Sequence, residues 1–188
     1  MAAPIRLDLG AGSKYHEGWT RVDQAIERKA LHSAAAEHDK VALNPDIACD
    51  LRSIPLPDDY ADEARAIHVI EHFYAWEALA LLKEWVRVIK PGGQLAIECP
   101  CLDKVLALAQ VPQITPNFVH WALYGDPRYE DPSMVHKWAY TQGQLLKLMG
   151  MAGLVQLRPE PPKFHEPIRD MRIVGYKPEA EQRIVLQK

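Results

Sequence analysis

The sequence has no apolar run that approaches the roughly 18 residues of a membrane-spanning helix, and Met1 to Pro4 lack the apolar core of a signal peptide. It also has no dense run of lysine or arginine, since 22 basic residues stand against 25 acidic ones for a net charge of −3. A protein that binds nucleic acid without sequence preference needs a positive field along the phosphates. We therefore expect a cytoplasmic protein with no membrane and no nucleic-acid partner.

Cysteine is scarce as well. The three residues Cys49, Cys99 and Cys101 are odd in number, and their spacing matches no disulfide framework, so we expect reduced thiols. The 188 residues, of which 48% are hydrophobic and 25% charged, suit one globular domain that spans residues 1–188.

What the sequence does contain is a strand that runs into a glycine turn. Ile5, Leu7 and Leu9 alternate with polar residues, which predicts a strand with one side in the core. Gly10 and Gly12 tolerate positive φ angles, and without a Cβ they let a ligand lie against the main chain. Asp8 adds a carboxylate at the end of the strand, where ligands bind in open α/β sheets. The motif favours a nucleotide-like cofactor.

Strand and helix patterns alternate along the rest of the chain. Further strands are predicted at 19–23, 47–51, 64–70, 94–98, 154–157 and 171–176, and helices at 75–89, from about 103, from Pro116 and at 142–152. Thr115 before Pro116, and the capping box from Thr141 to Gln144, mark two of the helix starts. The alternation predicts a Rossmann-like α/β fold, with a mainly parallel twisted sheet and helices on both faces. The last two strands, with no helix between them, predict an antiparallel hairpin at one edge.

The glycine turn differs from that of a dinucleotide-binding domain, which has a third glycine and an acid about 20 residues beyond the turn. Here Ser13-Lys14-Tyr15 follow Gly12 and supply no third glycine, and the acid at the end of the second strand, Asp23, comes early. The first helix is therefore reduced or absent, and with it the helix N-terminus that would bind a pyrophosphate. S-adenosylmethionine, a cofactor without phosphates, fits better than a nicotinamide dinucleotide.

The sequence resembles the class I S-adenosylmethionine-dependent methyltransferases, more narrowly the small methyltransferases of type 11. The segments that carry the likeness occur in the family's order over most of residues 5–177: LDLGAG (7–12), GWTRVD (18–23), CDLRSIPLPDDYAD (49–62), HVIEHF (68–73), VIKPGGQLAIE (88–98) and HKWAYT (136–141). The resemblance implies roles in cofactor binding for residues at four strand ends. Gly10, Ala11 and Gly12, next to Asp8, would surround the cofactor, Asp23 would bind its ribose, Asp50 and Leu51 would lie near adenine, and His68 would face the methionine part.

The string His68-Val-Ile-Glu71-His72 also matches the H-x-x-E-H pattern of a class of zinc peptidases. In that pattern both histidines lie on one helical face and bind the metal ion, and Glu77 or Glu84 could supply a third ligand. The residues before it read as the end of a strand, which would separate the two imidazoles. We therefore expect no metal.

Residues 100–140 are predicted to form an insertion or lid on the acceptor side. This segment and its surroundings are rich in rings, which align a substrate and exclude water: Phe118, Trp121, Tyr124, Tyr129, Trp138 and Tyr140, with His120 and His136. A histidine is a suitable proton acceptor for a hydroxyl or amine, and His72 and His136 are the candidates. Pro100-Cys101 could instead hold a nucleophilic thiol, but a buried structural cysteine is favoured.

These inferences predict an enzyme that moves the methyl group of S-adenosylmethionine to an O or N nucleophile. The acceptor is expected to be a small or sugar-containing molecule, and the protein a monomer or homodimer. A catalytically silent domain, which uses the same fold for binding or assembly, is the alternative.

Overall fold

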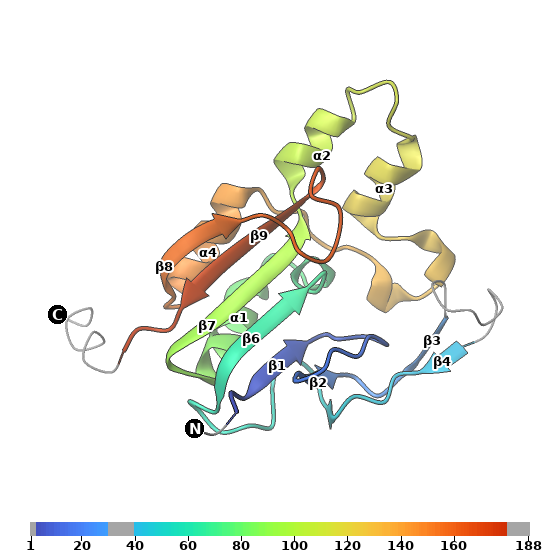
Figure 1. The fold of residues 1–188 in the computed structure, drawn as a ribbon. Helices are drawn as coiled ribbons and strands as arrows, with labels where there is room; N and C mark the ends of the chain where they lie inside the picture. Colours follow the sequence, from blue (N-terminus) through green and yellow to red (C-terminus); the bar gives the residue numbers. More distant parts are fainter. Residues whose placement is uncertain (1–2, 30–39, 180–188) are drawn as a thin grey trace.

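The structure is a computed structural model that describes residues 3–29 and 40–179 (Figure 1). Its main feature is a seven-stranded sheet with the strand order β5-β2-β1-β6-β7-β9-β8. The strands are β1 (Arg6–Leu9), β2 (Thr20–Asp23), β5 (Ile47–Ala48), β6 (Ala61–Ile67), β7 (Ile89–Pro100), β8 (Val155–Glu160) and β9 (Asp170–Tyr176). The first five are parallel, and β9 runs antiparallel to both β7 and β8. The predicted Rossmann-like, mainly parallel sheet is confirmed, including the antiparallel pair at one edge, but the helices that pack on the sheet cover one face rather than both.

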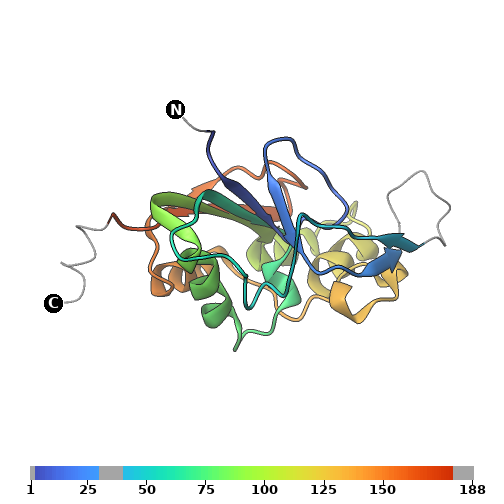
Figure 2. The same ribbon diagram turned by 90° about the horizontal axis from the view of Figure 1, so that it is seen from below.

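Four α-helices accompany the sheet in the described residues: α1 (Ala78–Arg87), α2 (Leu102–Leu108), α3 (Pro116–Tyr124) and α4 (Gln142–Met151). α1 and α4 contact each other as well as the sheet, so they lie on the same face of it (Figure 2). α2 and α3 pack together beyond the end of β7. Three short 3-10 turns, η1 (Ile70–His72), η2 (Pro127–Tyr129) and η3 (Pro132–Met134), and the hairpin of β3 (Glu27–Lys29) with β4 (Lys40–Ala42) complete the described elements.

The two faces of the sheet differ in chemistry because side chains alternate along each strand. One face is apolar and packs against α1 and α4 in a single buried core, which includes Leu7, Leu9, Ala64, Ala66, Leu95, Ile97, Leu82, Trp85 and Met149. The other face carries charges that are paired across neighbouring strands, Asp8 opposite Arg65 and Glu98 opposite Arg172. All four charged residues are buried.

Coil covers the charged face. Residues 10–19 form turns and no helix, which confirms the reduced first helix. The ring centroid of Trp19, from this coil, lies 4.0 Å from the guanidinium carbon of Arg65, and the ring centroid of Phe164 lies 4.7 Å from the same carbon. The loss of the helix after β1 thus leaves a face that two coil segments cover.

Several expected boundaries shift by a few residues, among them those of β5, β6, β7, β8 and α1. The strand predicted to extend to Ile70 ends at Ile67, and β7 begins at Ile89 and passes through the Pro91-Gly92-Gly93 break. Residues 24–40 mix alanine with both charge signs, which suggests an exposed helix or ordered loop; the structure instead has β3 and β4 at the two ends of this segment, and residues 30–39 lie outside the described residues. In the part of the chain that the structure describes, no helix has the length and apolar character to cross a bilayer.

Candidate functional site

A cavity of about 470 Å³ opens at the carboxyl ends of β1, β2 and β6. Ligands of open α/β sheets bind at this edge. Coil residues 129–137 and 164–165 close the cavity from the side. Of the predicted site residues, those that line it are Asp8, Gly10, Ala11, Gly12, Asp23, Leu51, His68 and His72.

Bare main chain forms part of the cavity wall at the turn after β1. Gly10 has a φ of +71°, and a Cβ there would lie 2.5 Å from Cγ2 of Val69. Gly12 has a φ of +59°, and a Cβ there would meet no atom within 4 Å. Both positions therefore favour glycine for its backbone conformation, and Gly10 also for close packing. Lys14, from the segment that follows Gly12, lines the cavity too.

Asp23 ends β2 with its carboxylate on the cavity. One oxygen accepts a hydrogen bond from the Gly12 amide at 2.8 Å, and the other accepts from the Gln24 amide at 2.7 Å. These two bonds fix the carboxylate next to the glycine turn. Each oxygen keeps a further lone pair for a ligand, as recognition of vicinal hydroxyl groups requires.

Asp8 also lines the cavity, but its carboxylate is engaged within the protein. Oδ2 lies 2.6 Å from Nη2 of Arg65 and 3.3 Å from Nδ1 of His16. Arg65 is held between the rings of Trp19 and Phe164. Asp8 therefore ties the sheet to the coil that shapes the cavity.

Asp50 and Leu51, both predicted to lie near adenine, differ in their position relative to the cavity. Leu51 lines the cavity, and its carbonyl accepts the indole hydrogen of Trp85 at 3.1 Å. Asp50 is exposed, does not line the cavity and pairs with Arg52 at 3.1 Å. Arg52 itself lines the cavity, with its guanidinium 4.7 Å from the ring centroid of Phe73. Arg52 and Phe73, which also lines the cavity, were not predicted as site residues from the sequence.

His68 follows β6 with a φ of +55°, a conformation that few residues other than glycine adopt. Its Nε2 lies 3.1 Å from Oδ2 of Asp170, and its Nδ1 lies 3.2 Å from Oε1 of Glu71. Burial lowers the pKa of His68, but hydrogen bonds to these two carboxylates outweigh burial and raise the pKa to about 9. His68 is therefore a cation at neutral pH.

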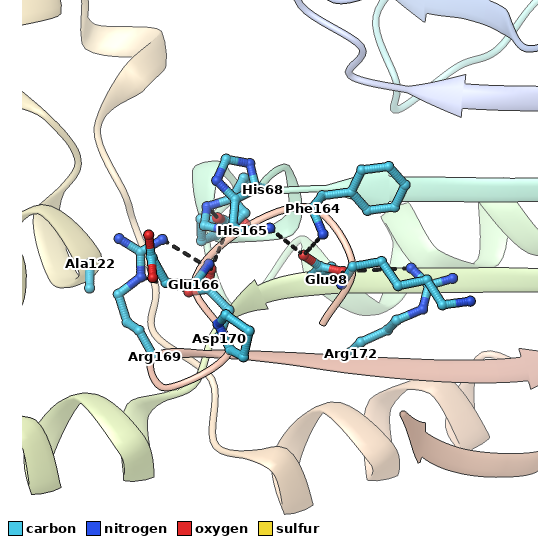
Figure 3. Close-up of polar contacts among 12 residues, drawn as sticks. His68, Glu98, Ala122, Phe164, His165, Glu166, Arg169, Asp170 and Arg172 are labelled. Carbon is cyan, nitrogen blue, oxygen red and sulfur yellow. Dashed lines mark hydrogen bonds and ion pairs between the residues drawn. The ribbon is translucent and has the colours of Figure 1, made fainter. Parts of the chain in front are cut away.

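The coil before β9 completes this side of the cavity (Figure 3). Glu98, fully buried at the end of β7, accepts hydrogen bonds from the amides of residues 163–165 at 2.8, 3.0 and 3.1 Å. This anchoring places His165 against His68, with 4.0 Å between ring centroids. Burial lowers the pKa of His165 to about 4, and the positive charge of His68 acts in the same direction. No pattern in the sequence pointed to His165.

Glu71, His72 and His136 form a cluster beside the cavity. One potential ligand atom from each side chain lies within 4.8 Å of the others, and the two imidazole centroids are 4.8 Å apart. Burial raises the pKa of Glu71, but the hydrogen bond and charge of His68 outweigh it and lower the pKa to about 2. Burial, opposed by the charge of Glu71, lowers the pKa of His72 to about 4. At neutral pH the cluster thus combines a carboxylate with a neutral His72 imidazole.

The H-x-x-E-H string is split as the sequence analysis expected. β6 ends before it, and η1 begins at Ile70, so the two histidines do not share a helical face. His68 turns to Asp170 and His165, whereas His72 turns to His136. The arrangement of a zinc peptidase is not present in the described residues.

The rings of residues 118–140 have different surroundings. Tyr129 lines the main cavity, while His120, Trp121 and Tyr124 line a second cavity of about 590 Å³. Tyr140 is buried in the core, where burial raises its pKa above the usual range. Cys101 is buried, is free of disulfides and lines neither cavity, as expected for a structural thiol.

Comparison with known proteins gives a consistent result. Residues 7–97 match the family model described as a methyltransferase domain. A search of curated proteins found no match. Solved structures with the same fold include an S-adenosylmethionine-dependent methyltransferase from Methanosarcina mazei, with 17% identity, 94% of this chain and 93% of that chain covered and a TM-score of 0.62.

A Thermotoga maritima protein described as a possible histamine N-methyltransferase has 16% identity over 94% of this chain and 84% of its own, with a TM-score of 0.60. Human N-acetylserotonin methyltransferase, solved with S-adenosylmethionine, has 17% identity over 93% of this chain and 48% of its own, with a TM-score of 0.57.

The strand order, with β9 inserted antiparallel between β7 and β8, defines a class I methyltransferase fold. Residues 7–97 match the methyltransferase-domain family, and the chain shares its fold with solved S-adenosylmethionine-dependent methyltransferases.

Proposed function

We propose that the protein transfers a methyl group from S-adenosylmethionine, bound in the 470 Å³ cavity, to an oxygen or nitrogen of a small or sugar-containing acceptor. The observation that carries this proposal is the juxtaposition of bare glycine main chain with the fixed Asp23 carboxylate in one cavity. A nucleoside needs a partner for its ribose hydroxyls and room for close approach, and these residues supply both.

In this proposal, Gly10, Ala11 and Gly12 contact the methionine part of the cofactor, Asp23 accepts hydrogen bonds from the ribose, and Leu51 packs against adenine. His68 lies beside the methionine part and, as a cation, interacts with its carboxylate. Asp50 acts indirectly, because it forms an ion pair with Arg52, and Arg52 is the residue that lines the cavity.

The acceptor side is assigned to coil 129–137, within the predicted insertion. Tyr129, Ser133, Met134 and Lys137 line the cavity from this segment, opposite the glycine turn. A lone pair of the acceptor forms the new bond to the methyl carbon while the carbon–sulfur bond breaks, and its electron pair stays on sulfur. The acceptor loses a proton in this step, and we propose that His72 and His136 assist its removal. With a pKa of about 4, His72 by itself is a weak base at neutral pH.

The cofactor assignment is tested with Asp23→Asn. Loss of the charge-assisted hydrogen bonds should weaken binding of S-adenosylmethionine and S-adenosylhomocysteine by about 10-fold or more, measured by calorimetry. Asp46→Asn is the matched control, because Asp46 also accepts from a backbone amide, that of Arg21 at 2.8 Å, but does not line the cavity. If neither ligand binds the wild type at millimolar concentration, or if both variants behave alike, the assignment fails.

The acceptor assignment is tested by incubating the protein with S-adenosylmethionine and panels of hydroxyl and amine compounds, including sugars. We expect production of S-adenosylhomocysteine, detected by mass spectrometry, to depend on one chemical class of acceptor. Turnover on nucleic acid alone would contradict the assignment.

A further inference from the structure

We propose that Glu71, His72 and His136 bind a divalent transition-metal ion on the wall of the cofactor cavity, and that this ion binds the oxygen of a hydroxyl acceptor. Metal binding stands on the geometry of the three side chains alone. The role toward the acceptor rests on the function proposed above and narrows the acceptor to a hydroxyl compound.

The ligand set has the composition and spacing of an open metal site. Two imidazoles and one carboxylate bind Zn²⁺ or Fe²⁺ in proteins and leave further coordination positions free. One ligand atom from each residue lies within 4.8 Å of the others, so small inward movements of the side chains bring all three onto one ion.

Hydrogen bonds orient both imidazoles for this task. Nδ1 of His136 lies 2.9 Å from the carbonyl oxygen of Ala122, and Nδ1 of His72 lies 3.3 Å from that of Val135. In each case Nδ1–H donates to the carbonyl, which leaves the lone pair on Nε2 for a metal. Histidines that bind metals are held by the same kind of backbone contact.

Glu71 lacks the donors that a buried carboxylate needs. Its side chain is 2% exposed, and apart from His68 no donor in the described residues reaches either oxygen. Its charge contact is with Nδ1 of His68, 3.2 Å from Oε1. The His68 cation offsets part of the cost of burying this carboxylate, and the oxygens of Glu71 keep lone pairs free for a metal ion. The main chain of Glu71 is fixed, because its carbonyl accepts from the amide of Lys137 at 2.7 Å, next to His136.

A second group with suitable atoms, His68, His165 and Asp170, does not meet the same conditions. Asp170 already accepts from the Arg169 guanidinium at 2.7 and 3.0 Å. This fixed guanidinium charge on the would-be ligand repels a metal ion. The cluster of Glu71, His72 and His136 therefore remains the candidate.

With the ion in place, His72 and His136 act on the acceptor through the metal rather than as direct proton acceptors. Of the three ligands, His72 lines the cavity, which places the proposed ion beside the space left for the acceptor. A hydroxyl bound to a divalent ion loses its proton to water more readily. The resulting alkoxide gives an electron pair to the methyl carbon, and the carbon–sulfur pair leaves with sulfur.

The test uses tag-free protein, because a polyhistidine tag binds the same ions. Apo protein is titrated with Zn²⁺ by calorimetry and with Co²⁺ by visible absorption, without cofactor. We expect one equivalent to bind the wild type, and His136→Gln and Glu71→Gln each to weaken binding at least 10-fold. His120→Gln, on the exposed face of α3, is the matched control and should bind like the wild type. Circular dichroism and thermal melting confirm that each variant is folded.

The proposal is overturned if the wild type binds less than one equivalent at 100-fold molar excess of Zn²⁺, or if the folded His136→Gln variant binds as the wild type does. If Glu71→Gln fails to fold, His136→Gln carries the test. Binding of S-adenosylmethionine, measured separately, reports on the cofactor assignment and is expected to survive His136→Gln. Chelation should remove turnover on a hydroxyl acceptor, and one equivalent of metal should restore it; turnover that is unchanged by chelation contradicts the role toward the acceptor.

Discussion

At the scale of single residues, Gly10 is the position where the site depends most on a missing side chain. An alanine there would place its Cβ 2.5 Å from the buried Val69 and would adopt a φ of +71°. We predict that Gly10→Ala lowers the free energy of unfolding by about 3 kcal/mol and abolishes cofactor binding. Gly18→Ala is the control, since its φ is +77° but no atom lies within 4 Å of the added Cβ. It should cost about 1 kcal/mol in urea unfolding and leave binding intact. Equal costs for the two variants would contradict the packing argument.

The predicted site residues that line the cavity share one property, namely that they lie at or near the carboxyl end of a strand. Gly10, Asp23 and Leu51 could be found because parallel strands end at one edge, and the order of the strands can be inferred from the order of the motifs. His165 and Lys137 could not, because they stand in coil whose path depends on distant partners. The Glu98 carboxylate accepts from the amide of His165, and the main-chain carbonyl of Glu71 accepts from the amide of Lys137.

At the scale of elements, two helices begin with threonine, but the caps differ. Thr141 accepts from the amide of Gln144, whose side chain accepts from the amide of Thr141 in turn. Thr115, before Pro116, makes no capping bond with its side chain. We predict that Thr141→Ala lowers the free energy of unfolding by about 1 kcal/mol, while Thr115→Ala changes it by less than about 0.5 kcal/mol. Chemical unfolding at equilibrium measures both. A cost for Thr115→Ala as large as that for Thr141→Ala would contradict this difference.

The start of β7 shows why element boundaries are harder to predict than elements. A Pro-Gly-Gly sequence such as residues 91–93 typically follows the end of a helix, and α1 ends nearby at Arg87. The strand nevertheless begins before this break, because Ile89 pairs with Ala61 and the amide of Gly92 donates to the carbonyl of Lys177 at 2.8 Å. These partners lie far away in sequence, so local chemistry alone does not place the strand's first residue.

At the scale of the whole molecule, the sheet has a helix-covered apolar face and a charged face covered by coil. The alternation in β1 and β6 contains this information, since apolar residues alternate with Arg6, Asp8, Glu63 and Arg65. A strand with helices on both faces is apolar throughout. The charged positions therefore agree with the loss of the first helix, which the early acid Asp23 had indicated. What alternation does not show is that the coil buries these charges.

This burial has a measurable consequence for the stability of the fold. Asp8 and Arg65 are 5% and 6% exposed in their side chains, whereas Arg6 and Glu63, a charge pair on the same two strands, are 37% and 34% exposed. Removing one member of the buried pair leaves an isolated charge, so Arg65→Met should cost about 3–5 kcal/mol. Arg6→Met should cost less than about 1 kcal/mol.

The double variant separates loss of the charge pair from loss of packing. If the penalty of Arg65→Met comes from the isolated Asp8 carboxylate, then Asp8→Asn combined with Arg65→Met should be more stable than the sum of the single changes predicts, by about 2 kcal/mol. Urea unfolding of the wild type, both single variants and the double variant gives this coupling directly. Additive losses would mean instead that Arg65 acts through its contacts with Trp19 and Phe164, and that the charged face is held by packing of the coil.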